Sequence, residues 1–252
     1  MSYPIIEFED ERIALIEPSK VIKPRDIPLY CVPCFFSDVL EKVVAAHSAR
    51  VVVPNRWEDG PHPLYEIEHR GERLAFYHPG IGSGLSAGLL EEVIAFGCRK
   101  FVACGGCGVL DKKVEFGQIV CVTAAVRDEG ASYHYLPPSR EVAANAGVVE
   151  AVMALLAARD VPHVAGKTWT TDAPYRETPS RIAKRKAEGC LTVDMEAAAM
   201  IAVAEFRDVA FGHVMYGGDD LSGCEWDNRD WQSRAEIRES LFWLCADAVL
   251  SL

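Results

Sequence analysis

The chain has 252 residues, half of them hydrophobic, and a formal net charge of −11 from 26 basic and 37 acidic residues. This length and composition predict one domain, 1–252, with a sizeable core, and the acidic balance disfavours nucleic acid as a partner. No apolar run reaches the roughly 20 residues of a membrane span, so we expect no membrane contact, a cytoplasmic location and a small-molecule ligand.

Short β-type runs recur along the chain and alternate with helical patterns. Strands are expected at 12–16, 49–54, 72–77, 100–104, 118–126, 163–169, 191–194 and 209–216. The long run at 118–126 is expected to bend and to serve two parts of a sheet. A loop and hairpin are expected over 53–72.

Helices are expected at 86–97, at 140–160 with Ser139 as N-cap, from Pro179 to Gly189 with Thr178 as N-cap, at 195–206 and at 234–252. Continuous apolar strands that alternate with helices indicate an α/β fold with a mixed, mostly parallel sheet covered on both faces. In such sheets, ligands bind at the carboxyl ends of strands. The residues that follow each strand are therefore the candidates for a site.

The segment "YHPGIGSGLSAG" follows an expected strand and opens a helix. Backbone N–H groups at such a turn can hold an anion or a sugar hydroxyl, although a glycine turn without a ligand is also possible. Gly82, Gly84 and Ala87 fit a dinucleotide-binding spacing, but the next expected strand ends in cysteine and glycine instead of an acidic residue. A nicotinamide cofactor is therefore disfavoured.

The segment "FVACGGCGVL" combines a Cys-x-x-Cys pair with three glycines. Cys104 and Cys107 could form a zinc site with Cys31 and Cys34, or a thioredoxin-like redox pair. Pro33 interrupts the first pair and no long helix follows the second, so we expect free, reduced thiols and no metal. A tight turn at the glycines, close to a ligand, is the alternative that we favour.

Two segments place carboxylates at strand ends. "TVDMEAAAM" carries Asp194 and Glu196 at a strand-to-helix junction, where a carboxylate could grip both hydroxyls of a ribose or could simply cap the helix. "YGGDDLSG" carries Asp219 and Asp220, of which a buried one could donate a proton to a leaving group. A solvated turn is the alternative for this second pair.

Taken together, these segments resemble the nucleoside phosphorylase family that includes uridine phosphorylase and the bacterial purine nucleoside phosphorylases. Six segments between about residues 74 and 223 occur in the family's order: "PGIGSG", "ACGGCGVL", "AVRDEGASYHYLP", "TTDAPYRET", "VDMEAAAM" and "GGDDLSG". The resemblance implies a single three-layer αβα domain that forms homodimers or hexamers. It also implies phosphorolysis of a nucleoside to free base and ribose 1-phosphate, without metal or organic cofactor and with phosphate as co-substrate.

The resemblance also assigns residues by position. Glu196 would hold the ribose hydroxyls, Met195 would pack beneath the sugar, and Asp219 would protonate a departing purine. Backbone at Gly82, Gly105 and Gly106 would approach the ligand, while Tyr175 and Arg176 would contact the base. Asp219 favours a purine, whereas "RDEGASYHY" resembles the uridine phosphorylases, so both a purine and a pyrimidine base are kept as alternatives.

The chain departs from the family pattern where phosphate is usually bound. Glu17, Pro18 and Lys20 stand where a glycine-rich loop with an arginine is common, Ala103 replaces a second arginine, and Gly106 replaces a serine or threonine. Pro174 replaces a frequent aromatic residue. Lys20, Arg56 and Arg127 are the candidate replacement cations. Otherwise water is the nucleophile and the protein is a nucleosidase, or it binds nucleosides without turnover.

Overall fold

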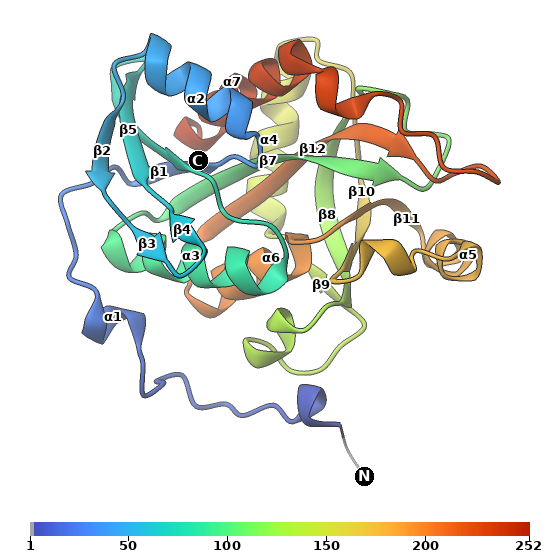
Figure 1. The fold of residues 1–252 in the computed structure, drawn as a ribbon, viewed down its shortest axis with the longest axis horizontal. Coiled ribbons are helices and arrows are strands. Elements are labelled where there is room, and N and C mark those ends of the chain that lie inside the picture. The colour runs from blue at the N-terminus through green and yellow to red at the C-terminus, as the bar shows by residue number, and fades with distance from the viewer. Residues whose placement is uncertain (1–2) are drawn as a thin grey trace.

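The computed structural model describes residues 3–252 (Figure 1). Its strands are β1 (Tyr30–Pro33), β2 (Arg50–Val53), β3 (Arg56–Trp57), β4 (Gly60–Pro61), β5 (Leu64–His69), β6 (Glu72–Tyr77), β7 (Lys100–Val109), β8 (Ile119–Asp128), β9 (Glu141–Ala143), β10 (His163–Thr171), β11 (Cys190–Asp194) and β12 (Ala210–Asp220). Ten of them form one sheet in the order β11, β10, β8, β12, β7, β1, β6, β5, β2, with β9 beside β8, and β3 and β4 form a separate hairpin.

The α-helices are α1 (Pro18–Val21), α2 (Ser37–Ala46), α3 (Ser83–Phe96), α4 (Ala146–Ala158), α5 (Pro179–Ala187), α6 (Ala197–Phe206) and α7 (Ala235–Leu250). Short 3-10 turns lie at Pro4–Ile6, Ala131–His134, Pro174–Arg176 and Trp231–Ser233. Figure 1 shows α2, α4 and α7 on one face of the sheet and α3 and α6 on the other, and each face has its own large apolar cluster. The expected αβα arrangement is confirmed.

Parallel pairing joins β6, β1, β7 and β12, and separately β8, β10 and β11. Antiparallel contacts join the two groups, because β12 pairs with β8, and β11 pairs with β7. Strands β7, β12, β8, β10 and β11 therefore form a closed ring. The expected double role of the 118–126 run is also confirmed, since β8 pairs with β10, β12 and β9.

Several local predictions were wrong. Residues 12–16 are not a strand, and their apolar side chains Ile13, Leu15 and Ile16 are exposed, Leu15 at 99%. The run therefore has strand-like composition but no partner in the sheet. The first strand is β1 instead, and the helix α2 that follows it was not predicted.

Two predicted helix caps also differ. Residues 141–143 form β9 instead of helix, and α4 is capped by Asn145, whose side chain accepts a hydrogen bond from the backbone N–H of Val148. The α5 prediction is confirmed, but the Thr178 side chain makes no capping bond. Separately, within residues 3–252 no helix has the length and apolar character needed to cross a membrane.

Candidate active site

A cavity of about 590 Å³ lies where the second half of β7 meets the carboxyl ends of β11 and β12. Its volume falls within the range of small-ligand pockets. The glycine segment of β7 forms one wall and the strand-to-helix junction 193–196 forms another. Asp219 with Trp226 and Trp231 forms a third, and Pro174, Tyr175 and Glu177 lie at the opening. Ile81, from the turn before α3, also lines the cavity, so five of the six family-like segments meet around one space.

Asp194 explains how the strand-to-helix junction is built. Its buried carboxylate accepts hydrogen bonds from the hydroxyls of Thr168 (3.1 Å) and Thr170 (2.8 Å) on β10. The other carboxylate oxygen accepts bonds from the backbone N–H groups of Glu196 (2.9 Å) and Ala197 (2.5 Å). Asp194 therefore satisfies the first N–H groups of α6, which is the capping role that we had considered for Glu196.

Glu196 is the N-cap residue of α6, yet its own side chain makes no capping hydrogen bond. The side chain lines the cavity, although the residue is only 8% exposed. One carboxylate oxygen, Oε1, accepts a 2.7 Å hydrogen bond from the backbone N–H of Gly82. Burial and the neighbouring Asp194 carboxylate raise the pKa of Glu196 to about 8. This group is therefore held in place, poorly solvated and available to a ligand with hydroxyl donors.

Gly82 acts through Glu196 and does not itself line the cavity. It precedes α3 with a φ of +87°, a backbone conformation that favours glycine. The turn before α3 was predicted from its glycines, and the structure places it beside the 193–196 junction. Met195 lines the cavity next to Glu196, as the predicted sugar contact requires.

The glycines of "FVACGGCGVL" do not form a turn, because all of them lie inside β7. That prediction was wrong, and none of Gly105, Gly106 or Gly108 has a positive φ. Their role is spatial instead. A Cβ atom on Gly105 would lie 3.1 Å from the Phe35 ring, and one on Gly108 would lie within 2.8 Å of Val193 and Leu221. Glycine lets neighbouring side chains pack against the strand and leaves backbone facing the cavity.

The two aspartates at the end of β12 have separate environments. Asp219 lines the cavity, and its carboxylate accepts a 2.7 Å hydrogen bond from the Trp226 indole N–H. Burial raises the pKa of Asp219. Asp220 instead pairs with Arg229 and accepts a bond from the Ser222 N–H, and these contacts hold its pKa below the usual range although burial opposes them. Asp219 is thus the better proton donor of the two.

The 174–177 turn stands at the cavity opening. Tyr175 lines it with 98% of its surface exposed, so it is free to cover a ligand, whereas Arg176 does not line the cavity. Sequence reasoning missed Glu177, which lines the cavity near Asp219. Burial and the Asp219 carboxylate raise the pKa of Glu177 to about 7.

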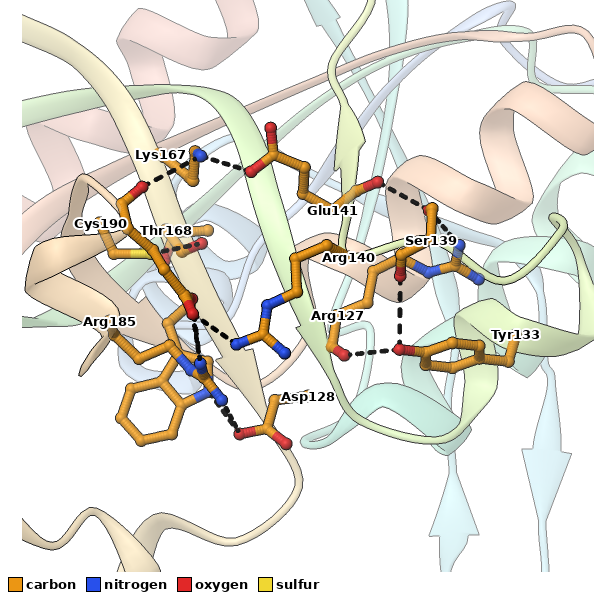
Figure 2. Close-up of polar contacts among 12 residues, drawn as sticks. Arg127, Asp128, Tyr133, Ser139, Arg140, Glu141, Lys167, Thr168, Arg185 and Cys190 are labelled. Atoms are coloured by element: carbon orange, nitrogen blue, oxygen red, sulfur yellow. Dashed lines mark hydrogen bonds and ion pairs between the residues drawn. The ribbon is translucent and has the colours of Figure 1, made fainter. Parts of the chain in front are cut away.

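The three predicted phosphate ligands lie outside this cavity. Lys20 is exposed on α1 and Arg56 is exposed on β3. Arg127 is buried and donates hydrogen bonds to Ser132, Ser139 and the carbonyl oxygens of 136–137. Figure 2 shows Arg127 close to Ser139 and Tyr133. Its hydrogen bonds organise the loop after β8, at a distance from the glycine wall.

Among residues 3–252, Arg238 is the one lysine or arginine that lines the cavity. Its guanidinium donates a 2.8 Å hydrogen bond to Asp38 and lies 4.6 Å from the centroid of the Phe36 ring. Sequence reasoning missed Arg238 because it lies in α7, far from the family-like segments. It also missed His213, Phe35 and Trp226.

The cysteine pairs do not gather into one site. Cys31 lies against Cys98, whereas Cys104 lies beside Cys34 and Cys245, and all of these thiols are buried. Burial raises the pKa of Cys104 and of Cys107, which keeps them as thiols. Within the described residues, no group of three or more histidine, cysteine or acidic side chains is arranged to hold a metal ion.

Comparison with known proteins gives a consistent result. The family model described as "Phosphorylase superfamily" matches residues 34–248. A guanosine phosphorylase of Halorubrum lacusprofundi is 25% identical over 151 residues, which is 60% of this chain and 63% of that protein, so the match spans less than two thirds of that relative.

Two solved structures share the fold. A uridine phosphorylase from Vibrio fischeri superposes with a TM-score of 0.76 at 16% identity, over 94% of this chain and 98% of that one. An AMP nucleosidase from Bacteroides thetaiotaomicron has a TM-score of 0.73 at 19% identity, over 89% of this chain and 88% of that one. At these identities the likeness describes the fold alone.

Proposed function

Because this chain belongs to the phosphorylase superfamily, we propose that it cleaves the N-glycosidic bond of a ribonucleoside or deoxyribonucleoside. The observation that carries the proposal is the placement of Glu196 and Asp219 on the walls of one cavity. One carboxylate is fixed by a backbone N–H at a helix start, and the other carboxyl has a raised pKa at a strand end. Bond cleavage needs these two functions, one on the sugar and one on the leaving base.

The proposed reaction proceeds through a transition state with positive charge on the sugar. Glu196 accepts hydrogen bonds from the ribose hydroxyls, Met195 packs against the sugar, and the bare backbone of Gly105 and Gly106 lets the ligand come close. Asp219 donates a proton to the base as the C1′–N bond breaks. Positioning and charge complementarity account for most of the catalysis.

Phosphate is the proposed nucleophile, which makes the protein a pentosyltransferase that releases ribose 1-phosphate. The matched family and the guanosine phosphorylase of Halorubrum lacusprofundi support this choice. We further propose a homo-oligomer in the cytoplasm, with no metal and no organic cofactor in the reaction. Lys20 and Arg56 are exposed and therefore free to serve a neighbouring subunit's site.

Hydrolysis is the second candidate, and a specific observation favours it. Where the resemblance places phosphate ligands, the structure has Ala103 and Gly106, and the Phe35 ring lies against Gly105. No lysine or arginine other than Arg238 lines the cavity within the described residues. A phosphate dianion in such a space has few charge partners, whereas a water molecule needs only hydrogen bonds.

One experiment separates these activities. The protein is incubated with purine and pyrimidine nucleosides, with and without phosphate, and the products are separated by chromatography. Ribose 1-phosphate formed only with phosphate indicates phosphorolysis, and free ribose in both conditions indicates hydrolysis. Binding without any product would contradict the proposal and would leave a nucleoside-binding protein. The same panel determines which base is preferred.

A further inference from the structure

His213 is a buried side chain for which the family-like segments give no role. It lies in the middle of β12, is only 3% exposed and lines the cavity. Neither ring nitrogen, Nδ1 or Nε2, has a hydrogen-bond partner among the described residues. A buried polar group without a partner is unusual and costs stability, so a partner supplied by the ligand is a physical explanation for it.

Apolar rings hold the imidazole of His213 in a fixed orientation. The Phe35 ring stacks on it with centroids 5.9 Å apart and an interplanar angle of 24°, and Phe211 contacts it edge to face at 6.3 Å. Neither ring offers a hydrogen-bond acceptor in the plane of the imidazole. His213 is therefore oriented by packing and not by hydrogen bonding.

Gly105 leaves space next to His213. A Cβ atom built on Gly105 would lie 3.6 Å from Nε2, so a larger side chain at this position would stand between the imidazole and the glycine wall. His213 and Ala103 are also neighbours in the register of β12 and β7. The imidazole thus lies beside the position where the resemblance expects a phosphate-binding arginine.

The surroundings keep the imidazole neutral. Burial lowers the pKa of His213, and the carboxylate of Asp194 only partly opposes this shift. A neutral imidazole has one N–H donor and one nitrogen acceptor. It can therefore accept a hydrogen bond from a water molecule or donate one to a phosphate oxygen.

We propose that His213 is a catalytic residue that binds the oxygen nucleophile attacking C1′, an inference that rests on the proposed bond cleavage. The C1′–O bond forms while the C1′–N bond breaks. The electron pair of the C1′–N bond leaves with the base, and the base takes a proton from Asp219. If the nucleophile is water, its proton passes to the free nitrogen of His213 and then to solvent. If it is phosphate, the imidazole N–H binds a phosphate oxygen and no proton moves to His213.

Three variants test this role. His213→Phe keeps a flat ring beside Phe35 and removes both nitrogens, whereas His213→Gln keeps a donor and an acceptor. His163→Phe is the matched control, since His163 lies at the far end of β10, does not line the cavity and hydrogen-bonds to the carbonyl oxygen of Val161. Rates, KM values for nucleoside and phosphate, and thermal unfolding midpoints are measured for all three.

We expect His213→Phe to lose about tenfold or more in rate without a lower unfolding midpoint, His213→Gln to retain more of the rate, and His163→Phe to match wild type. With phosphate as nucleophile, the loss appears mainly as a higher KM for phosphate. With water, it appears in kcat while the KM for nucleoside stays within about twofold.

Wild-type rates in His213→Phe overturn the inference while the proposed function stands. Equal losses in His213→Phe and His213→Gln, together with lower unfolding midpoints, also overturn it, because they indicate a structural role only. Absence of any cleavage by the wild-type protein overturns both proposals.

Discussion

The backbone N–H of Gly82 donates a 2.7 Å hydrogen bond to Oε1 of Glu196, across 114 residues of sequence. This bond connects the turn before α3 with the start of α6, two helices that pack on the same face of the sheet. It fixes the carboxylate on which the proposed sugar recognition depends. Its consequences for activity and for stability can be measured separately.

Replacing Glu196 tests the sugar contact. We expect Glu196→Ala to lower turnover by at least about tenfold at a pH above the raised pKa of Glu196, where the group is ionised, because a charged hydrogen bond to a hydroxyl is worth about 1.5–3 kcal/mol. Steady-state kinetics with a ribonucleoside and its 2′-deoxy counterpart measure the effect. The variant should also discriminate less between the two sugars, since the 2′ hydroxyl then has no carboxylate partner. Near-wild-type turnover in Glu196→Ala would contradict the assignment.

If Asp219 is the proton donor, activity should decrease at high pH. A carboxyl that donates a proton must be protonated in the free enzyme, so kcat/KM should fall as pH rises through the raised pKa of Asp219. The Asp219→Asn variant should be much slower and should lack this fall. A profile that is flat through the same range in the wild-type protein would exclude Asp219 as the donor.

Two neighbouring carboxyls provide controls for that profile. Glu177 has a pKa raised to about 7, so Glu177→Gln shows whether the fall belongs to Glu177 instead. Asp220 is paired with Arg229 and has a lowered pKa, so Asp220→Asn should leave the shape of the profile unchanged. If Glu177→Gln abolishes the fall and Asp219→Asn does not, Glu177 is the proton donor.

Replacing Asp194 should lower the stability of the folded protein. Its carboxylate accepts four hydrogen bonds from Thr168, Thr170, Glu196 and Ala197. Asp194→Ala leaves these buried donors without a partner, so the free energy of unfolding should fall by about 2–4 kcal/mol. Thr168→Val removes one donor and should cost about 1 kcal/mol. Urea unfolding measures both, and a loss for Asp194→Ala no larger than that for Thr168→Val would contradict this account.

Glu196 also predicts how stability depends on pH. In the folded protein its pKa is raised to about 8 from an ordinary value of 4.5, so the folded state binds more protons than the unfolded state between these values. Stability is therefore greatest below the unfolded pKa and should decrease as pH rises toward 8, by about 1.4 kcal/mol per unit of pH for a fully buried group.

The Glu196→Gln variant isolates this contribution. It should show a smaller decrease in the free energy of unfolding between pH 5 and pH 8, because glutamine does not titrate. Urea unfolding of the unliganded proteins at about three pH values within this range provides the comparison. Parallel pH dependences for the two proteins would show that Glu196 is already ionised in the folded state.

The strand-to-helix junctions of the site could be predicted from sequence because their signals are local. A short apolar run, then Asp194 and Glu196, then an alanine-rich helix identifies the start of α6 without knowledge of the rest of the chain. The glycines before α3 are equally informative. What the sequence could not show is that Asp194 caps α6 and so leaves Glu196 to the cavity, because that depends on the hydroxyls of β10.

Other features depend on contacts between distant segments. The 12–16 run has the residues of a strand, but strand formation needs a neighbouring strand, and none is adjacent to it in the sheet. The glycines of β7 have the composition of a turn, yet the rings of Phe35 and Tyr216 and the side chains of Val193 and Leu221 account for them. His213 stands in an apolar run that is typical of core, so nothing local distinguishes it.

The pairing of β11 with β7 closes the ring of strands and joins the glycine wall directly to the segment that ends in Asp194. These parts therefore belong to one cooperative unit, and opening one strand exposes the amide groups of the other to hydrogen exchange. Entry and release of a ligand must then depend on the turns at the cavity opening, which move without breaking the ring. Backbone pairing within the ring therefore keeps the reacting groups rigid, whereas the turns at the cavity opening set the rate at which the ligand enters and leaves.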